Sequence, residues 1–158
     1  MLYALYGGLA LTAMWATMRD FDLFWIGFWL VVGFVASNLL DWYMPPGFKP
    51  GPYTLIEMLV ALAAYCAFVE HRMKGLIGIV GVTVASIAIN VAFASILDPD
   101  RRQIHLYEVT TNICFAAETL LAIAVGVAHG RRTGRFTRWP LVRRHAAEPN
   151  VARKDGGQ

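Results

Sequence analysis

The chain has 158 residues, of which 57% are hydrophobic and 16% are charged, and its net charge is +3. Soluble globular domains contain about 25% charged residues, and a chain of this length has too little interior to bury so much apolar surface. The composition excludes an ordinary water-soluble domain and favours a protein embedded in lipid.

Apolar runs divide the first 130 residues into five predicted helices. The runs are residues 1–18, 23–42, 53–69, 75–97 and 104–128. Each is 17 to 25 residues long, which at about 1.5 Å per residue is enough to cross a ~30 Å hydrocarbon layer. The runs do not alternate polar and apolar residues as membrane strands do. We therefore predict an all-α, polytopic transmembrane helical bundle of about five spans over residues 1–130.

The first run could also be a secretory signal peptide, and its cleavage would leave four spans. Signal peptides begin with a basic segment, and no Lys or Arg precedes Arg19. We therefore expect the first helix to be retained.

Proline and glycine mark two further features of the predicted bundle. Residues 45–52 contain four prolines, which disfavour helix, so an extended loop is expected there. Gly75, Gly78 and Gly81 recur at every third position of the fourth run. This spacing allows helices to approach one another closely.

Basic charge collects after the last run. Residues 129–158 carry eight basic and two acidic side chains, whereas residues 1–128 carry six basic and nine acidic. We predict a basic, partly disordered tail over residues 131–158. Beside a transmembrane helix, such a tail favours anionic lipid headgroups over nucleic acid as its partner. The predicted headgroup-binding residues are Arg131, Arg132, Arg135 and Arg138.

The distribution of Lys and Arg among the loops predicts an orientation. Eleven basic residues fall on the side of the tail and three on the other side. Basic residues favour the cytoplasmic side of a membrane. The tail is therefore predicted to be cytoplasmic, and five spans then place the N-terminus outside.

Several polar residues fall within the apolar runs, where they are costly and often functional. Counting from the helix ends at about 1.5 Å per residue places most of them in the outer half of the membrane. Helical spacing places Ser86 and Asn90, with Thr83, on one stripe of the fourth helix. It also places the polar residues of the fifth helix on one face, and we expect the two to face each other. The candidate polar site is Asn38, Glu57, Ser86, Asn90, Glu108, Asn112 and Glu118.

Most of these residues have a structural interpretation as well. Asn, Ser and Thr often hold membrane helices together, and Glu57 and Glu108 are shallow enough to reach headgroups or pair with Arg101 or Arg102. Glu118 lies near mid-membrane, where a carboxyl group must be protonated and hydrogen-bonded or face water. Tyr65 and Ser86 are candidate partners for it. Glu118 is therefore the candidate proton site, ion site or pore-lining group.

No metal, cofactor or enzymatic activity is predicted. A cluster of Asp98, Asp100, His105 and Glu108 contains metal-ligating residue types. We favour a charged turn that is neutralised by its own arginines, with Asp100 as the N-cap of the fifth helix. The sequence holds no catalytic motif and no evident pairing of a nucleophile with a base.

Residues 107–115, Tyr-Glu-Val-Thr-Thr-Asn-Ile-Cys-Phe, resemble a segment of small multi-pass membrane proteins of tailed bacteriophages. The aromatic-rich helix that ends near Asn38 and the proline-bearing loop after it are similar too. The resemblance covers the last four spans and implies a phage or bacterial origin, with the chain in the bacterial inner membrane. That group has no assigned chemistry, so no functional residue is carried over.

Two classes of function follow from these observations. The first is a non-enzymatic membrane scaffold or accessory subunit, or a phage lysis protein of the holin type. The alternative is a small ion- or proton-coupled transporter or channel that uses Glu118. In either class a second copy of the chain or another membrane protein is an expected partner.

Overall fold

The computed structural model describes residues 2–43, 50–96 and 99–134, and these residues form helices without any strand. The helices are α1 (Leu2–Thr17), α2 (Phe21–Tyr43), α3 (Pro50–His71), α4 (Lys74–Ala94) and α5 (Arg101–Arg132). The predicted all-α class with five helices is confirmed.

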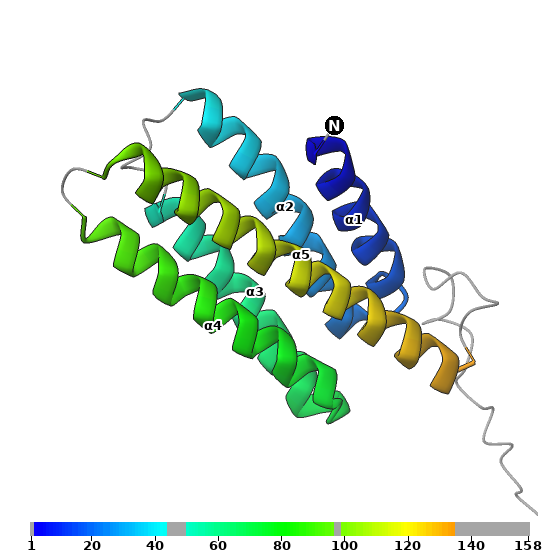
Figure 1. The fold of residues 1–158 in the computed structure, drawn as a ribbon. Coiled ribbons are helices and arrows are strands. Elements are labelled where there is room, and N and C mark those ends of the chain that lie inside the picture. The colour runs from blue at the N-terminus through cyan, green and yellow to red at the C-terminus, as the bar shows by residue number, and fades with distance from the viewer. Residues whose placement is uncertain (1, 44–49, 97–98, 135–158) are drawn as a thin grey trace, which may run out of the picture.

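The five helices form a closed bundle (Figure 1). Each helix packs against its neighbours in chain order, and α5 completes the ring by packing against α1. A smaller contact joins α2 and α5 across the ring. Because successive helices run in opposite directions, the turns from α1 to α2 and from α3 to α4 lie at one end. The connections from α2 to α3 and from α4 to α5 lie at the other end.

Four of the helices, α2 to α5, are long and apolar enough to cross a membrane. The bundle also exposes large apolar side chains such as Leu62, Ile113 and Leu120. A surface of this kind suits contact with lipid rather than water. α1 has 16 residues, or about 24 Å of helix, so it is shorter than the other four and its crossing remains a prediction.

The boundary of α3 corrects one prediction. Residues 50–52 were expected in an extended loop, but α3 already begins at Pro50 and includes Pro52. The first turn of a helix has no internal partners for its N–H groups, so proline is tolerated there. The remainder of the predicted loop, residues 45–49, lies outside the described residues.

α5 is longer than predicted, and its start is well capped. The side chain of Asp100 accepts a hydrogen bond from the Gln103 N–H at 2.7 Å, and the Gln103 side chain accepts one from the Asp100 N–H at 2.8 Å. This reciprocal capping box satisfies two N–H groups that the helix leaves unpaired. The predicted N-cap role of Asp100 is confirmed, and the helix continues past residue 128 to Arg132.

Of the three glycines of α4, only Gly75 lies in very close contact with the neighbouring helix α5. A Cβ atom at Gly75 would lie 2.6 Å from Val125 Cγ2, so α4 and α5 approach closely there. A Cβ atom at Gly78 would make ordinary contact with Leu121, and one at Gly81 would meet nothing within 4 Å. The predicted close approach is therefore confirmed at Gly75 and wrong at Gly81.

Arg72 connects α3 to α4 in a left-handed backbone conformation, with φ of 52°. Its N–H donates to the carbonyl of Phe68 at 2.8 Å, which ends α3. This conformation costs a residue with a side chain about 1–2 kcal/mol. Glycine adopts it without this cost, although glycine loses more backbone entropy on folding.

Because the relief of the conformational cost exceeds the loss of entropy, we expect Arg72→Gly to raise the free energy of unfolding by about 0.5–1 kcal/mol.

Thermal melting of the purified protein in detergent measures this effect. The matched control is Arg102→Gly, because Arg102 is exposed within the regular first turn of α5. Glycine is unfavourable within a helix, so the control should melt at or below the temperature of the unmodified protein. A lower melting temperature for Arg72→Gly would contradict the prediction.

Candidate functional site

A cavity of about 270 Å³ lies among the five helices, in the half of the bundle that contains the connections from α2 to α3 and from α4 to α5. Every helix contributes to its wall, from Tyr6 on α1 to Glu118 on α5. Six of the seven predicted polar site residues line it, namely Asn38, Glu57, Asn90, Glu108, Asn112 and Glu118. The seventh, Ser86, is hydrogen-bonded to Glu57. The helical packing therefore brings the whole predicted set to one place.

Glu57 on α3 forms the centre of the polar contacts. The Ser86 hydroxyl donates to Glu57 Oε1, and the Asn90 amide donates to Oε2 at 2.7 Å. Both donors come from α4 and are buried. The predicted alternatives for Glu57, headgroup contact or pairing with Arg101 or Arg102, are wrong, since the carboxyl group points into the bundle toward α4.

Asn90 extends these contacts to α5. Its amide oxygen accepts a hydrogen bond from the Tyr107 hydroxyl at 2.8 Å, and the Tyr107 ring stacks on Phe93 with 4.1 Å between ring centroids. Asn90 is fully buried. Glu57, Ser86, Asn90 and Tyr107, here named the Glu57 network, thus join α3, α4 and α5 through side chains alone.

Tyr107 is a member of this network that sequence reasoning missed. It precedes Glu118 by eleven residues, which is three helical turns, so the two side chains share a face of α5. That spacing is the signal that could have identified it.

Glu118 is the most deeply placed acidic side chain of the cavity wall, with 3% of its surface exposed. Its Oε1 atom has no hydrogen-bond partner among the described residues, while Thr83 of α4 lies beside the carboxyl group. The predicted partners are wrong, because Tyr65 is 57% exposed and Ser86 donates to Glu57. A buried polar atom without a partner is rare and needs an explanation.

The predicted polar faces of α4 and α5 are confirmed in part. Thr83, Ser86 and Asn90 are all buried on one stripe of α4. On α5, Glu118 is buried, whereas Glu108 and Asn112 are exposed although they line the cavity. The α4 stripe also meets Glu57 of α3, so it does not face α5 alone.

No family model matches the chain, and no curated protein or solved structure is significantly similar to it. The resemblance of residues 107–115 to phage membrane proteins therefore stays a prediction. What the site does has to be argued from its own chemistry.

The described wall of the cavity is acidic and aromatic. It contains three glutamates, Glu57, Glu108 and Glu118, and no Lys, Arg or His among its described residues. Its aromatic side chains are Tyr6, Trp29, Phe34, Tyr53, Phe93, Tyr107 and Phe115. Carboxylates and the faces of aromatic rings both attract cations, and the attraction is stronger where water is excluded. The cavity is therefore suited to a positively charged guest.

The predicted headgroup-binding residues lie at the opposite end of the bundle. Arg131 and Arg132 are exposed in the last turn of α5, a position from which they could reach a lipid surface. Arg135 and Arg138 lie outside the described residues. Lipid binding by this end of the chain stays a prediction.

Proposed function

We propose that the protein binds a small cation in the cavity and acts as a small proton-coupled membrane transporter. The observation that carries the proposal is the pair of carboxyl groups, Glu57 and Glu118, facing one cavity whose described wall has no basic side chain. A positive charge or a proton is needed to offset the buried carboxylate of Glu118, and the half-buried Glu57 beside the same cavity would add to the attraction for a cation. A bound cation would supply the partner that Glu118 Oε1 lacks.

The chemistry of the wall favours an organic ammonium cation as the guest. A bare metal ion prefers to be surrounded by oxygen ligands, whereas much of this wall is aromatic. Ammonium groups with an apolar body are recognised by aromatic rings together with a carboxylate. The volume of about 270 Å³ is close to the lower end of the range of about 300–1,000 Å³ for small-molecule sites, so the substrate would be small.

Proton exchange follows from the burial of Glu118. Without a cation, the carboxyl group is most stable when it holds its proton, because an isolated buried carboxylate is very costly. When the cation binds, the proton leaves and the carboxylate pairs with the cation. The charge inside the bundle is the same in both states, which makes exchange across an apolar layer feasible.

The Glu118→Gln variant tests this proposal. We expect the purified protein to bind tetramethylammonium or tetraethylammonium and to release a proton, and the variant to bind at least tenfold more weakly without proton release. Calorimetry in two buffers of different ionisation enthalpy measures affinity and proton release together. Glu70→Gln is the matched control, because Glu70 is exposed at the opposite end of α3 and does not line the cavity.

Two results would contradict the proposal. The first is that Glu118→Gln binds the cation with the same affinity and the same proton release as the unmodified protein. The second is that proteoliposomes containing the protein take up no tetraethylammonium under a pH gradient. The scaffold hypothesis predicts the second result together with co-purification of a membrane partner. The lysis hypothesis predicts instead that induced expression collapses the membrane potential and stops growth.

A further inference from the structure

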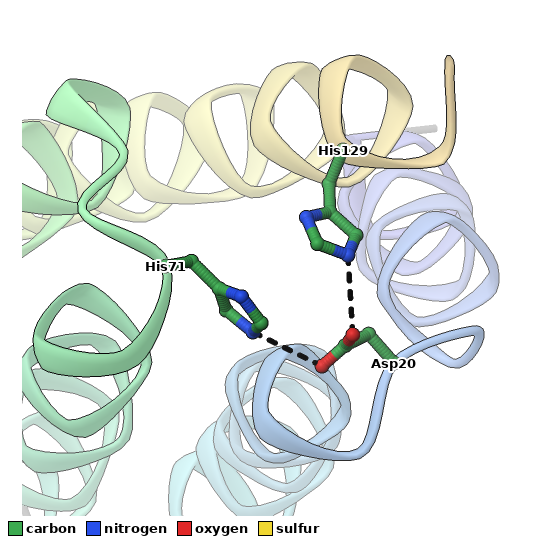
Figure 2. A group of neighbouring side chains, drawn as sticks. All are labelled: Asp20, His71 and His129. Atoms are coloured by element: carbon green, nitrogen blue, oxygen red, sulfur yellow. Dashed lines mark hydrogen bonds and ion pairs between the residues drawn. The ribbon is translucent and has the colours of Figure 1, made fainter. Parts of the chain in front are cut away.

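A second group of side chains lies at the end of the bundle opposite the cavity. Figure 2 shows the imidazole rings of His71 and His129 directed at the carboxylate of Asp20. His71 Nε2 is 3.2 Å from Asp20 Oδ1, and His129 Nε2 is 3.1 Å from Asp20 Oδ2. The three side chains are between 11% and 17% exposed, so they are largely withdrawn from solvent.

The chain brings these three residues together from its helix ends. Asp20 immediately precedes α2 and accepts a hydrogen bond from the Asp22 N–H at 3.0 Å, the usual position of an N-cap. His71 is the last residue of α3, and His129 lies in the last turn of α5. These helix ends lie at the same end of the bundle (Figure 1). In the sequence, however, the histidines are 51 and 109 residues away from Asp20.

The distances suit coordination of a metal ion. In a tetrahedral zinc site, bonds of about 2.0–2.2 Å place neighbouring ligand atoms about 3.3–3.6 Å apart. The two Asp20–histidine distances, each to a different oxygen of the carboxylate, are slightly shorter than this value. One ligand atom from each of the three residues lies within 4.8 Å of the others. Asp22 Oδ2 is 3.5 Å from His71 Nε2, but its carboxylate does not belong to the group of three that meets this distance limit.

The charge of the group is also suitable for a divalent cation. The carboxylates of Asp20 and Asp22 both lie beside His71. Together they can offset the two positive charges of such an ion.

We propose that Asp20, His71 and His129 bind a divalent transition-metal ion of the zinc class. Two imidazoles and carboxylate oxygens are the ligand types that such ions accept. The ion would join the turn between α1 and α2 to the ends of α3 and α5. It would therefore stabilise the bundle at the end opposite the cation cavity.

Metal titration of the full chain in detergent, after removal of metals with a chelator, tests the proposal. We expect one Zn²⁺ per chain, with an affinity that His71→Ala or His129→Ala lowers at least tenfold. Removal of a residue that only orients a metal ligand lowers metal affinity by about 10–100-fold. Removal of a ligand itself should lower the affinity at least as much. Zn²⁺ should also raise the melting temperature, since it binds the folded chain, and this rise should disappear in both variants.

The matched control is His105→Ala. His105 is exposed near the other end of α5, roughly 36 Å of helix from His129, so its removal should leave the Zn²⁺ affinity unchanged. Asp20→Asn is the second variant if a histidine variant does not fold, because the amide keeps the shape and the hydrogen-bonding oxygen but loses the charge. It should lose Zn²⁺ binding as well.

A spectroscopic measurement needs no variant. Co²⁺ added to the unmodified chain should produce the intense visible absorption of a tetrahedral site, and Zn²⁺ should abolish it. Absence of these bands would overturn the proposal and leave Asp20 and the histidines as a hydrogen-bonded contact only. Zn²⁺ affinity that is unchanged in the histidine variants would overturn it equally.

Discussion

Asn90→Ala is expected to lower the free energy of unfolding by about 3 kcal/mol, because buried groups that lose hydrogen-bond partners cost about 1–3 kcal/mol each. Asn90 is fully buried and donates to Glu57 Oε2 while accepting from the Tyr107 hydroxyl. Alanine removes both interactions. It also leaves a space where α3, α4 and α5 meet. Denaturation by an increasing fraction of SDS, followed by circular dichroism, measures the change.

The control for this prediction is Ser95→Ala, immediately after the same helix. Ser95 is exposed, and its hydroxyl donates to the carbonyl of Ala92 within its own turn. Surface substitutions of this kind usually change stability by less than about 0.5 kcal/mol. If the two variants unfold at the same SDS fraction, the Glu57 network does not hold the three helices together.

The helices themselves could be predicted from the sequence because length and apolarity decide them. Five apolar runs bounded by charges and prolines correspond to α1 through α5, with boundary errors where capping or a first-turn proline extends a helix. Asp100 was identifiable as a cap because Gln103 follows it at the required spacing. These are local features, and each depends on only a few neighbouring residues.

The rotation of each helix about its own axis was harder to predict. In α4, three polar residues share one stripe, so the buried face could be identified, and it is buried. In α3, apolar residues occupy every side, and Glu57 alone gives no preferred direction. Its contact with Ser86 and Asn90 results from the packing of α3 against α4, which no local pattern specifies. For the same reason, the partners expected for Glu118 were wrong.

The group of Asp20, His71 and His129 illustrates a different difficulty. Antiparallel topology alone places all three residues at one end of the bundle, so their shared level could have been deduced. Their contact also requires α2, α3 and α5 to lie around a common point, and this depends on the order of the helices in the ring. Metal-ligating residue types that are close together along the chain, such as Asp100, His105 and Glu108, lie instead near the start of α5 at the opposite end of the bundle.

The second large effect is expected at the contact between α1 and α5. A Cβ atom at Gly126 would lie 2.6 Å from the carbonyl oxygen of Ala16 and 2.7 Å from the carbonyl carbon of the same residue. Both atoms belong to the backbone of α1, so no side-chain rotation can relieve the clash and the whole helix must move. We expect Gly126→Ala to lower the free energy of unfolding by about 3 kcal/mol, at the upper end of the usual cost of overpacking.

Gly8→Ala and Gly81→Ala are the matched controls, because a Cβ atom at either position would meet nothing within 4 Å. Alanine is a better helix former than glycine, so both controls should be at least as stable as the unmodified protein in the same SDS titration. Equal stability of Gly126→Ala and the controls would contradict the close packing of α1 on α5.

This packing also affects the cavity, because α1 contributes to the cavity wall. α1 is the shortest helix, and a second glycine contact, in which a Cβ atom at Gly27 would lie 2.7 Å from Met14 Cα, holds it against α2. Tyr6 of α1 forms part of the cavity wall. Displacement of α1 in Gly126→Ala should therefore open the cavity, and this variant should bind the proposed cation more weakly than the unmodified chain. Gly81→Ala, on α4, should bind it with unchanged affinity.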